Sequence, residues 1–596
     1  MLNPNHDRLD YGEILSAPAG YVLDFAVGTT YSLDPDALVG ACLALGLSHE
    51  TDSTLRNNPI CLLEALRSTG DKIALFCQGG QIQFPANATA LYVLLEKIVY
   101  EVVPEKGNKK DGYPSFHPKF WLIRYINGDK NPLYRVVVLS RNLTFDRSWD
   151  ITFTMDGTIK KETTDKNAPV IDFLKYLSNY AGDKQVAIKK LIHELPHVCF
   201  SLDSKEFHDF EFLPIGIKGK YRFDRDPLFT ESYREVLIMS PFLTGSVIRS
   251  FQDRRPKNAL DYILITRAMS LPKLKPEDCK DFSVYTLKDA IVDGESIISE
   301  ENSDFHGQDI HAKLYVVCKG YDTDLYLGSL NASHMGIYRN IEFMIRLKSK
   351  KRFLDLSTIT NSLFCTADGD KGNPFQQVSI DSQQAEPPRD EKTALLEAVL
   401  KDFLHTKHSA TVQSGGENYE IHMHLQPLET KCSIQLCPFL SHDGKEYAED
   451  MVFTEIPLTE LSEFYKIQVS YGDHRICRLI KIPTTGIPED REKAIVSSMV
   501  KYEWAFYQYI AFLLGDNHVF SAMEEAFGHN TSRQNGTSPK KLFSPLYEKL
   551  LRTAYEAPEK LKGIDYLLKR ISQDQAVPKG FLQMYETLRK VVKVDD

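Results

Sequence analysis

The chain contains the same ordered set of sequence signals twice. Each copy opens with a β-rich run that ends in small or hydroxylated residues, YVLDFAVGTTYSLD in the first and YREVLIMSPFLTG in the second. A second apolar run follows, and then a predicted strand carrying His-x-Lys. His117 and His311 lie 194 residues apart, and the downstream Asn142 and Asn331 lie 189 apart. A nearly constant offset of this size indicates the duplication of a whole domain.

Strand-like and helix-like segments alternate in each copy, which predicts an α/β fold with a mixed sheet covered by helices. A polar stretch rich in Gly, Pro, Gln and Asp then reads as a linker, followed by strand-rich and finally helical sequence. The expected C-terminal part is therefore α+β, with strands before helices. The predicted units are a first half over residues 1–205, a second half over 206–366, a linker over 367–392, a β-rich domain over 393–485 and a helical domain over 486–596.

A bare His-x-Lys has little meaning, because about one is expected by chance in a chain of 596 residues with 17 histidines. His405-Thr406-Lys407 is such a case, with no predicted strand and no Ser-x-Asn after it. The other two differ because their context repeats. Side chains alternate across a strand, so His117 and Lys119 share one face, as do His311 and Lys313.

Each half continues with Ser-x-Asn at the end of another apolar strand, and then with a carboxylate. Asp150 follows the first Asn by eight residues and Glu342 follows the second by eleven. The predicted site residues are therefore His117, Lys119, Ser140, Asn142 and Asp150 from the first half, and His311, Lys313, Ser329, Asn331 and Glu342 from the second.

Paired about a pseudo-twofold axis, these groups form a site suited to a phosphodiester. Lysine and asparagine donate to the non-bridging oxygens, and one imidazole can attack phosphorus to form a covalent phosphoenzyme. The other imidazole can protonate the leaving oxygen and then activate water, while the carboxylates hold the ring N–H groups. We predict His117 as the nucleophile and His311 as the general acid, although the near symmetry leaves the reverse open. The lysines supply the positive charge, so the sequence requires neither a metal nor another cofactor.

These residues resemble the phospholipase D superfamily, whose signature is HxK with a downstream GSxN, usually present twice. The matching segments are HPKFWLIRY with SRNLT and HAKLYVV with GSLNAS, within residues 15–360. The aspartate that many members carry five residues after the lysine is replaced by Arg124 and Cys318. That departure looks like the nuclease and tyrosyl-DNA phosphodiesterase branches, and the first copy is particularly similar to the latter.

The resemblance implies a phosphohistidine intermediate, metal independence and a duplicated phospholipase D-like fold. It suggests an endonuclease acting on nucleic acid, DNA rather than RNA, of a bacterial anti-phage or restriction type that works with a helicase or ATPase partner. The alternatives are a tyrosyl-DNA-phosphodiesterase-like end-processing enzyme, a lipid phosphodiesterase or phosphatidyltransferase, and a non-catalytic interaction protein. The oligomeric state is left open.

Composition constrains the partners. With 81 acidic and 71 basic residues the net charge is −10, which excludes a uniformly basic nucleic-acid-coating protein but not a local basic groove. There is no run of about 20 apolar residues and no secretory signal pattern, and the ten cysteines are scattered singly. We therefore expect a cytoplasmic protein with free thiols and no membrane partner.

Three basic runs flank the motif segments and could form a groove that follows phosphates. They are Lys106, Lys109 and Lys110; Arg254, Arg255 and Lys257; and Lys348, Lys350, Lys351 and Arg352. His422 and His424 share one strand face, but nothing at ligand spacing supports a metal site there. No GxxxxGK[ST] or GxGxxG motif indicates a nucleotide site.

Overall fold

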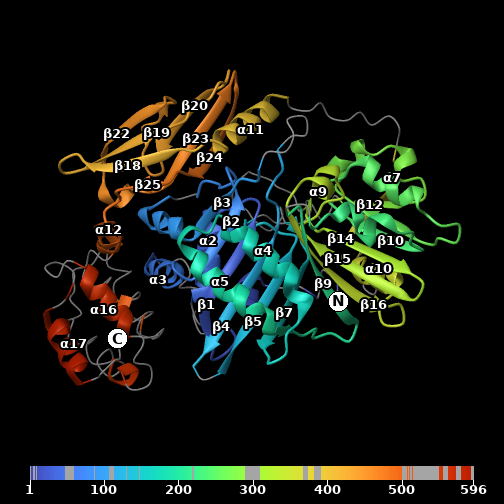
Figure 1. Ribbon diagram of the computed structural model, residues 1–596, viewed down its shortest axis with the longest axis horizontal. Coiled ribbons are helices and arrows are strands. Elements are labelled where there is room, and N and C mark those ends of the chain that lie inside the picture. Colours follow the sequence, from blue (N-terminus) through green and yellow to red (C-terminus); the bar gives the residue numbers. More distant parts are fainter. Residues whose placement is uncertain are drawn as a thin grey trace, which may run out of the picture.

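The computed structural model describes most of the chain (Figure 1). The residues that are not described are 1, 4–6, 8–9, 47–58, 86–87, 106–112, 129, 146–147, 218–219, 289–308, 367–372, 381–390, 500–505, 508, 511–512, 514–549, 555–560, 572–576, 578 and 592–596. No helix in the described ranges is long and apolar enough to cross a membrane.

The first half is built on a seven-stranded mixed sheet of order β3-β2-β1-β4-β5-β7-β8. Its strands are β1 (Val22–Thr30), β2 (Ile73–Gln78), β3 (Val99–Val102), β4 (Phe120–Asn127), β5 (Lys130–Leu139), β7 (Thr152–Ile159) and β8 (Val198–Phe200). Its helices are α1 (Tyr11–Leu15), α2 (Pro35–Gly46), α3 (Pro59–Thr69), α4 (Ala168–Ser178) and α5 (Gln185–Glu194), with the 3₁₀ helix η2 (Ala90–Lys97) before β3. The residues of β4 from Phe120 to Tyr125 are all buried, as expected for a central strand covered on both faces.

The second half repeats this arrangement in an eight-stranded sheet of order β17-β12-β11-β10-β14-β15-β16-β9. Its strands are β9 (Phe207–Ile215), β10 (Glu235–Met239), β11 (Tyr262–Ile265), β12 (Ser283–Leu287), β14 (Leu314–Lys319), β15 (Asp322–Gly328), β16 (Glu342–Lys350) and β17 (Phe375–Val378). Its helices are α6 (Pro227–Thr230), α7 (Gly245–Asp253), α9 (His334–Tyr338) and α10 (Leu356–Leu363).

Strand order and direction agree between the halves. In each, three parallel strands (β1, β2, β3 and β10, β11, β12) continue into three antiparallel ones (β4, β5, β7 and β14, β15, β16). The predicted α/β class with duplicated mixed sheets is therefore confirmed.

The two sheets share the central core of the molecule. Apolar side chains from both sheets and from α4, α5 and α10 form one buried cluster. The rings of Phe120 and Phe343, one from each half, have centroids 4.4 Å apart. The outer face of the first sheet packs against α2 and α3, and that of the second sheet packs against α6 and α7.

The β-rich region begins with α11 (Glu391–Leu404) and contains two four-stranded sheets around their own core. Its strands are β18 (Ser409–Ser414), β19 (Tyr419–His424), β20 (Ser433–Pro438), β21 (Lys445–Glu446), β22 (Asp450–Ile456), β23 (Phe464–Tyr471), β24 (His474–Lys481) and β25 (Thr484–Thr485). The C-terminal helices α12 (Asp490–Met499), α16 (Leu561–Arg570) and α17 (Lys579–Val591) lie beside α3 in Figure 1.

Two details differ from the expected division. The sequence predicts a linker over 367–392, but this segment contains β17, which pairs with β12. The strand is held there because Phe375 is buried against the rings of Phe364 and Trp149. The segment 486–596 was expected to be a separate helical domain, yet its apolar side chains join the cluster formed by α2 and α3 of the first half. Neither contact leaves a local pattern in the sequence.

Candidate active site

The predicted site residues lie at matching strand ends of the two sheets. His117 and Lys119 immediately precede β4, and His311 and Lys313 immediately precede β14. Ser140 directly follows β5, and Ser329 directly follows β15. These strands pair with β4 and β14, so in each half the Ser-x-Asn motif and the His-x-Lys motif lie at the same end of two adjacent strands. The histidines thus lie just before the strands on which they were predicted, in extended backbone.

Matching hydrogen bonds identify equivalent positions in the halves. The hydroxyls of Thr30 and Ser240 each donate to the carbonyl oxygen two residues further along the chain. Thr30 Oγ1 also accepts the N–H of Leu143, and Ser240 Oγ accepts that of Ala332, both at 2.9 Å. The serines of the two Ser-x-Asn motifs also match. Ser140 Oγ donates to Asp150 and accepts from Ile151 N, and Ser329 Oγ donates to Glu342 and accepts from Phe343 N.

Each histidine is held by the carboxylate of the other half. His117 Nδ1 lies 2.9 Å from Glu342 Oε2, and His311 Nδ1 lies 3.2 Å from Asp150 Oδ1. The backbone crosses in the same way, since His117 N donates to Ile341 O and His311 N donates to Trp149 O. The short strands β6 (Ser148–Trp149) and β13 (Asp309–Ile310) pair in parallel across this junction. Neither half-site is complete without the other half.

The two lysines of the motifs are fully buried beside the histidines. Lys119 Nζ is 3.0 Å from His117 O and 3.0 Å from His117 Nε2, and Lys313 Nζ is 2.6 Å from His311 O and 3.4 Å from Ser140 O. Burial, together with the charge of Lys119, holds the pKa of Lys313 well below its usual value. Buried positive charges placed this close together favour an anionic ligand.

The two histidine–carboxylate pairs differ electrostatically. Burial and the charges of Lys119 and Lys313 lower the pKa of His117 well below its usual value, and burial raises the pKa of Glu342 to about 8. Burial and the charge of Lys313 lower the pKa of His311 to about 4. The pKa of Asp150 lies below its usual value, because hydrogen bonds from His311 and Ser140 and the charge of Lys313 outweigh its burial. Asp150 is thus an ionised partner, whereas Glu342 holds a proton near neutral pH.

The asparagines of the two Ser-x-Asn motifs each have a buried side-chain oxygen without a hydrogen-bond partner among the described residues. These atoms are Asn142 Oδ1 and Asn331 Oδ1. An orphaned buried acceptor costs about 1–3 kcal/mol. Its occurrence at equivalent positions favours contact with a ligand, either through this oxygen or, with the amide turned over, through the NH₂ group. Hydrogen bonds thus join the histidines, lysines, serines and carboxylates of the two halves, and each asparagine lies two residues after its serine.

Two further residues of the site escaped prediction. Gln78 Oε1 accepts the N–H of Phe116 at 2.6 Å, and Arg267 Nε donates to Ile310 O at 2.6 Å. Each thus fixes the residue before one of the two motif histidines, Gln78 directly at the end of β2 and Arg267 two residues beyond β11. Tyr31 also packs its ring against His117, with centroids 5.1 Å apart. Their only sequence signal is their position at strand ends.

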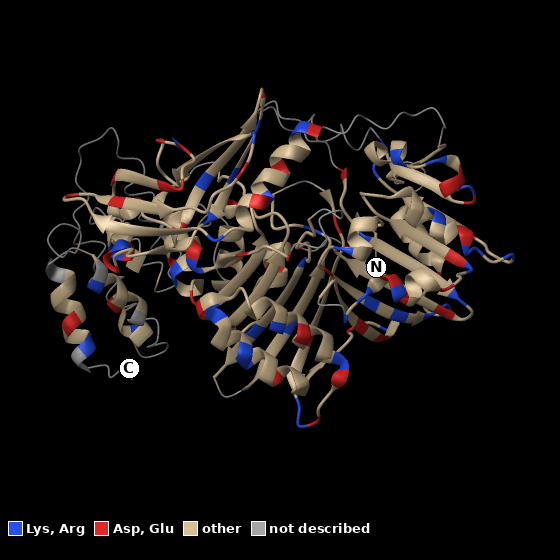
Figure 2. Cartoon of the chain, turned by 45° about the horizontal axis from the view of Figure 1, so that its top comes forward, with Lys and Arg blue, Asp and Glu red and all other residues tan. Residues whose placement is uncertain are grey.

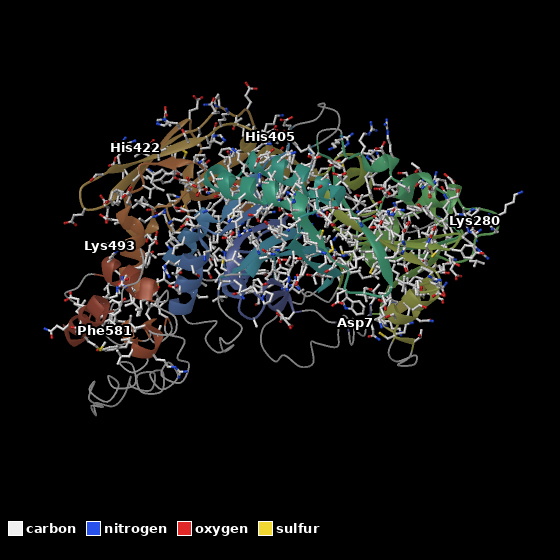
Figure 3. All side chains as sticks on the ribbon, turned by 60° about the horizontal axis from the view of Figure 1, so that its bottom comes forward. Asp7, Lys280, His405, His422, Lys493 and Phe581 are labelled. Atoms are coloured by element: carbon white, nitrogen blue, oxygen red, sulfur yellow. The ribbon has the colours of Figure 1, made fainter. Side chains whose placement is uncertain are left out.

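The other sequence candidates lie elsewhere or are neutralised. His405 bonds main-chain carbonyls of Lys401 and Pro104, and His422 and His424 pair with Glu420 and Asp450. Figure 3 places His405 and His422 on the β-rich region, well away from Lys280 at the tip of the second half. No group of three or more potential metal ligands occurs among the described residues, and no disulfide joins their cysteines.

Several residues of the two described basic runs are paired with carboxylates. The run Lys106, Lys109 and Lys110 lies outside the described residues. Lys348 pairs with Asp209 and Glu211, and Lys350 with Asp322, on neighbouring strands. Lys351 pairs with Glu235 of β10, and Arg255 lies 3.7 Å from Asp281. Figure 2 likewise shows acidic and basic residues interspersed over the described surface. The concentrated positive charge is that of the buried lysines.

No protein-family model and no curated protein matches the sequence. Among solved structures, yeast tyrosyl-DNA phosphodiesterase is similar at 15% identity and a TM-score of 0.36, over 59% of this chain and 87% of that one. Polyphosphate kinase from Porphyromonas gingivalis is similar at 13% identity and a TM-score of 0.33, over 66% of this chain and 51% of that one. Likeness this low leaves the geometry of the site itself as the basis for a function.

Proposed function

We propose that the chain is a metal-independent phosphodiesterase that hydrolyses nucleic-acid phosphodiester bonds, DNA rather than RNA, through a covalent phosphohistidine. One observation carries the proposal. Two imidazoles, each bonded to the carboxylate of the other half, share a pocket with two buried ammonium groups. Nucleophile, proton donor and charge stabilisation for a phosphodiester are then all present in the chain's own residues.

The electrostatic difference between the pairs favours His117 as the nucleophile. Its lowered pKa keeps the imidazole neutral and Glu342 lies at Nδ1, so Nε2 is the nitrogen that attacks phosphorus once Lys119 Nζ, 3.0 Å from it, turns to the substrate oxygens. A phosphorus–nitrogen bond forms as the bond to the leaving oxygen breaks. The lysines and asparagines stabilise the charge on the non-bridging oxygens.

His311 then serves as the general acid and later as the base. Ionised Asp150 stabilises its imidazolium form, and a bound phosphodiester offsets the lysine charge that contributes to the low pKa of His311. The imidazolium gives its proton to the leaving oxygen. In the second step neutral His311 takes a proton from water, water oxygen bonds to phosphorus, and the bond to His117 breaks.

The biological setting rests on the sequence resemblance alone. It favours an endonuclease in bacterial anti-phage or restriction-type defence that works with a helicase or ATPase partner. The additional C-terminal region would then select or position the substrate or this partner.

The test is an incubation of the purified chain with plasmid, single-stranded DNA and RNA, each with and without EDTA. We expect the chain to cleave DNA at the same rate with and without EDTA. His117→Ala and His311→Ala should each reduce the cleavage rate by at least about 10³-fold. Cleavage that disappears with EDTA would contradict the metal-free mechanism. Full activity in both variants would show that this pocket is not the active site.

A further inference from the structure

The rim of the pocket differs between the halves at two equivalent positions. Thr30 and Ser240 are equivalent by their hydrogen bonds, so Ser32 in the first half corresponds to Phe242 in the second. Thr30 pairs with Cys77, and Met239, just before Ser240, pairs with Ile265. Gln78 therefore corresponds to Arg267. The second half thus has an aromatic ring and a guanidinium where the first has a hydroxyl and an amide.

Phe242 and Arg267 contact each other at the surface. The guanidinium carbon lies 5.0 Å from the centroid of the Phe242 ring, and Phe242 is 44% exposed. Arg267 Nε is the guanidinium nitrogen that contacts both Ile310 O, at 2.6 Å, and Asp309 Oδ2, at 3.0 Å. The Nη groups have no hydrogen-bond partner among the described residues. The guanidinium lies over one face of the exposed ring, so the opposite face is the one that a further flat group could stack on.

This platform adjoins the reacting groups of the second half. Arg267 bonds the carbonyl of Ile310, the residue before His311. Phe242 O accepts from Ser240 Oγ, which also accepts the N–H of Ala332, the residue after Asn331. The equivalent positions of the first half are Ser32 and Gln78, and the nearby ring of Tyr31 packs against His117 with Lys119 Nζ over it at 6.0 Å.

We propose that Phe242 and Arg267 form a subsite that stacks one unpaired nucleobase beside the scissile phosphate, on the His311 side. The inference rests on the proposed function and deepens it, because it makes single-stranded nucleic acid the substrate. Every base has a π-face that stacks on an aromatic ring, and arginine adds a cation–π contact. A base within a duplex has both faces covered by its neighbours and must first be unstacked. Since His311 is the general acid, the stacked base belongs to the leaving segment of the strand.

The test uses a 20-nucleotide DNA of mixed, non-self-pairing sequence, labelled at its 5′ end, whose cleaved phosphate is mapped with the wild-type chain. Phe242→Ala should lower kcat/KM on this strand by about 5- to 150-fold, the effect of losing one base–aromatic stack. Phe242→Trp should restore cleavage. The matched control is Phe353→Ala, because Phe353 is 52% exposed and also has a guanidinium, that of Arg352, over its ring at 4.5 Å. It follows β16 at the end opposite Glu342 and should leave cleavage unchanged.

A second arm replaces single nucleotides next to the cleaved phosphate with abasic sites. The abasic position on the leaving side should slow the wild-type chain about as much as Phe242→Ala does, and the two changes together should cost little more than either alone. Annealing the complementary strand should slow cleavage at least about tenfold. Additive effects, or equal rates on duplex and single strand, would overturn the subsite while leaving the nuclease in place. Failure of the wild-type chain to cleave any nucleic acid would instead overturn the proposed function.

Discussion

The two half-sites have the same hydrogen-bonding framework and different electrostatics. In both, a buried serine holds the carboxylate that bonds the histidine of the other half. Glu342 is fully buried and its pKa is raised to about 8, whereas the pKa of Asp150 is lowered by its partners. The two halves therefore form matching scaffolds whose carboxyl groups differ in pKa, and the proposed assignment of nucleophile and proton donor rests on that difference.

The surroundings of the halves differ as well. The β-rich region docks on the first half, where Glu101 Oε2 accepts Lys481 N and Glu101 Oε1 accepts Gly80 N. Leu400 and Leu404 of α11 lie so close to Gly80, at φ +70°, that a side chain there would collide with them. The rim of the second half instead carries the exposed Phe242. The first half thus contacts the β-rich region, whereas the second half has the exposed ring of Phe242 next to its motif residues.

The largest expected difference between the halves appears with a leaving group that needs no proton. On thymidine 5′-monophosphate p-nitrophenyl ester, His311→Ala should release about one equivalent of p-nitrophenolate in a burst and accumulate phosphoenzyme, because only the second step then lacks its base. His117→Ala should release none, a loss of at least about 10⁴-fold in the burst rate. Rapid-mixing absorbance and an alkaline gel of labelled enzyme measure both. A burst from His117→Ala alone would reverse the two roles.

Exchange of the carboxylates should also separate the two sides. Asp150→Asn removes the ionised partner of His311 and should lower kcat by about 10²–10⁴-fold. Glu342→Gln replaces a carboxyl that already holds a proton near neutral pH and should cost only about tenfold. Steady-state cleavage of the mapped single strand measures both. Asp156→Asn, which disturbs a surface ion pair with Arg135 on the same sheet, is the control and should leave kcat unchanged. Equal losses of kcat in Asp150→Asn and Glu342→Gln would mean that the two carboxyl groups contribute equally to the reaction.

The smallest expected effect concerns the docking edge of the first half. Burial raises the pKa of Glu101 to about 7. The folded chain then binds more protons than the unfolded chain between pH of about 4.5 and 7, so the stability contributed by this group declines as pH rises through that window, by about 3 kcal/mol in all. Glu101→Gln should flatten this decline in urea unfolding measured from pH 5 to 8. The exposed Glu105→Gln is the control and should keep the wild-type slope. An unchanged slope in Glu101→Gln would exclude Glu101 as its source.

Local patterns carried the prediction of the site residues. Strand periodicity places His117 with Lys119, and the repeat identifies the second set from the first. The exchange of Asp150 and Glu342 between the halves could not be read from the sequence, because each lies closer in the chain to its own half's histidine than to its partner. The basic run at Lys348, Lys350 and Lys351 was misleading for a related reason, since its neutralising carboxylates come from other strands.

The sequence by itself predicted the duplication, the α/β class and ten candidate site residues, because strand periodicity and a constant offset are properties of the chain alone. Only the tertiary structure decided which carboxylate serves which histidine, which strand the segment after residue 366 joins, and where the C-terminal region docks. These depend on contacts between residues that are 88 or more positions apart in the chain, or on burial, which sets the pKa of each group only once both sheets have packed together.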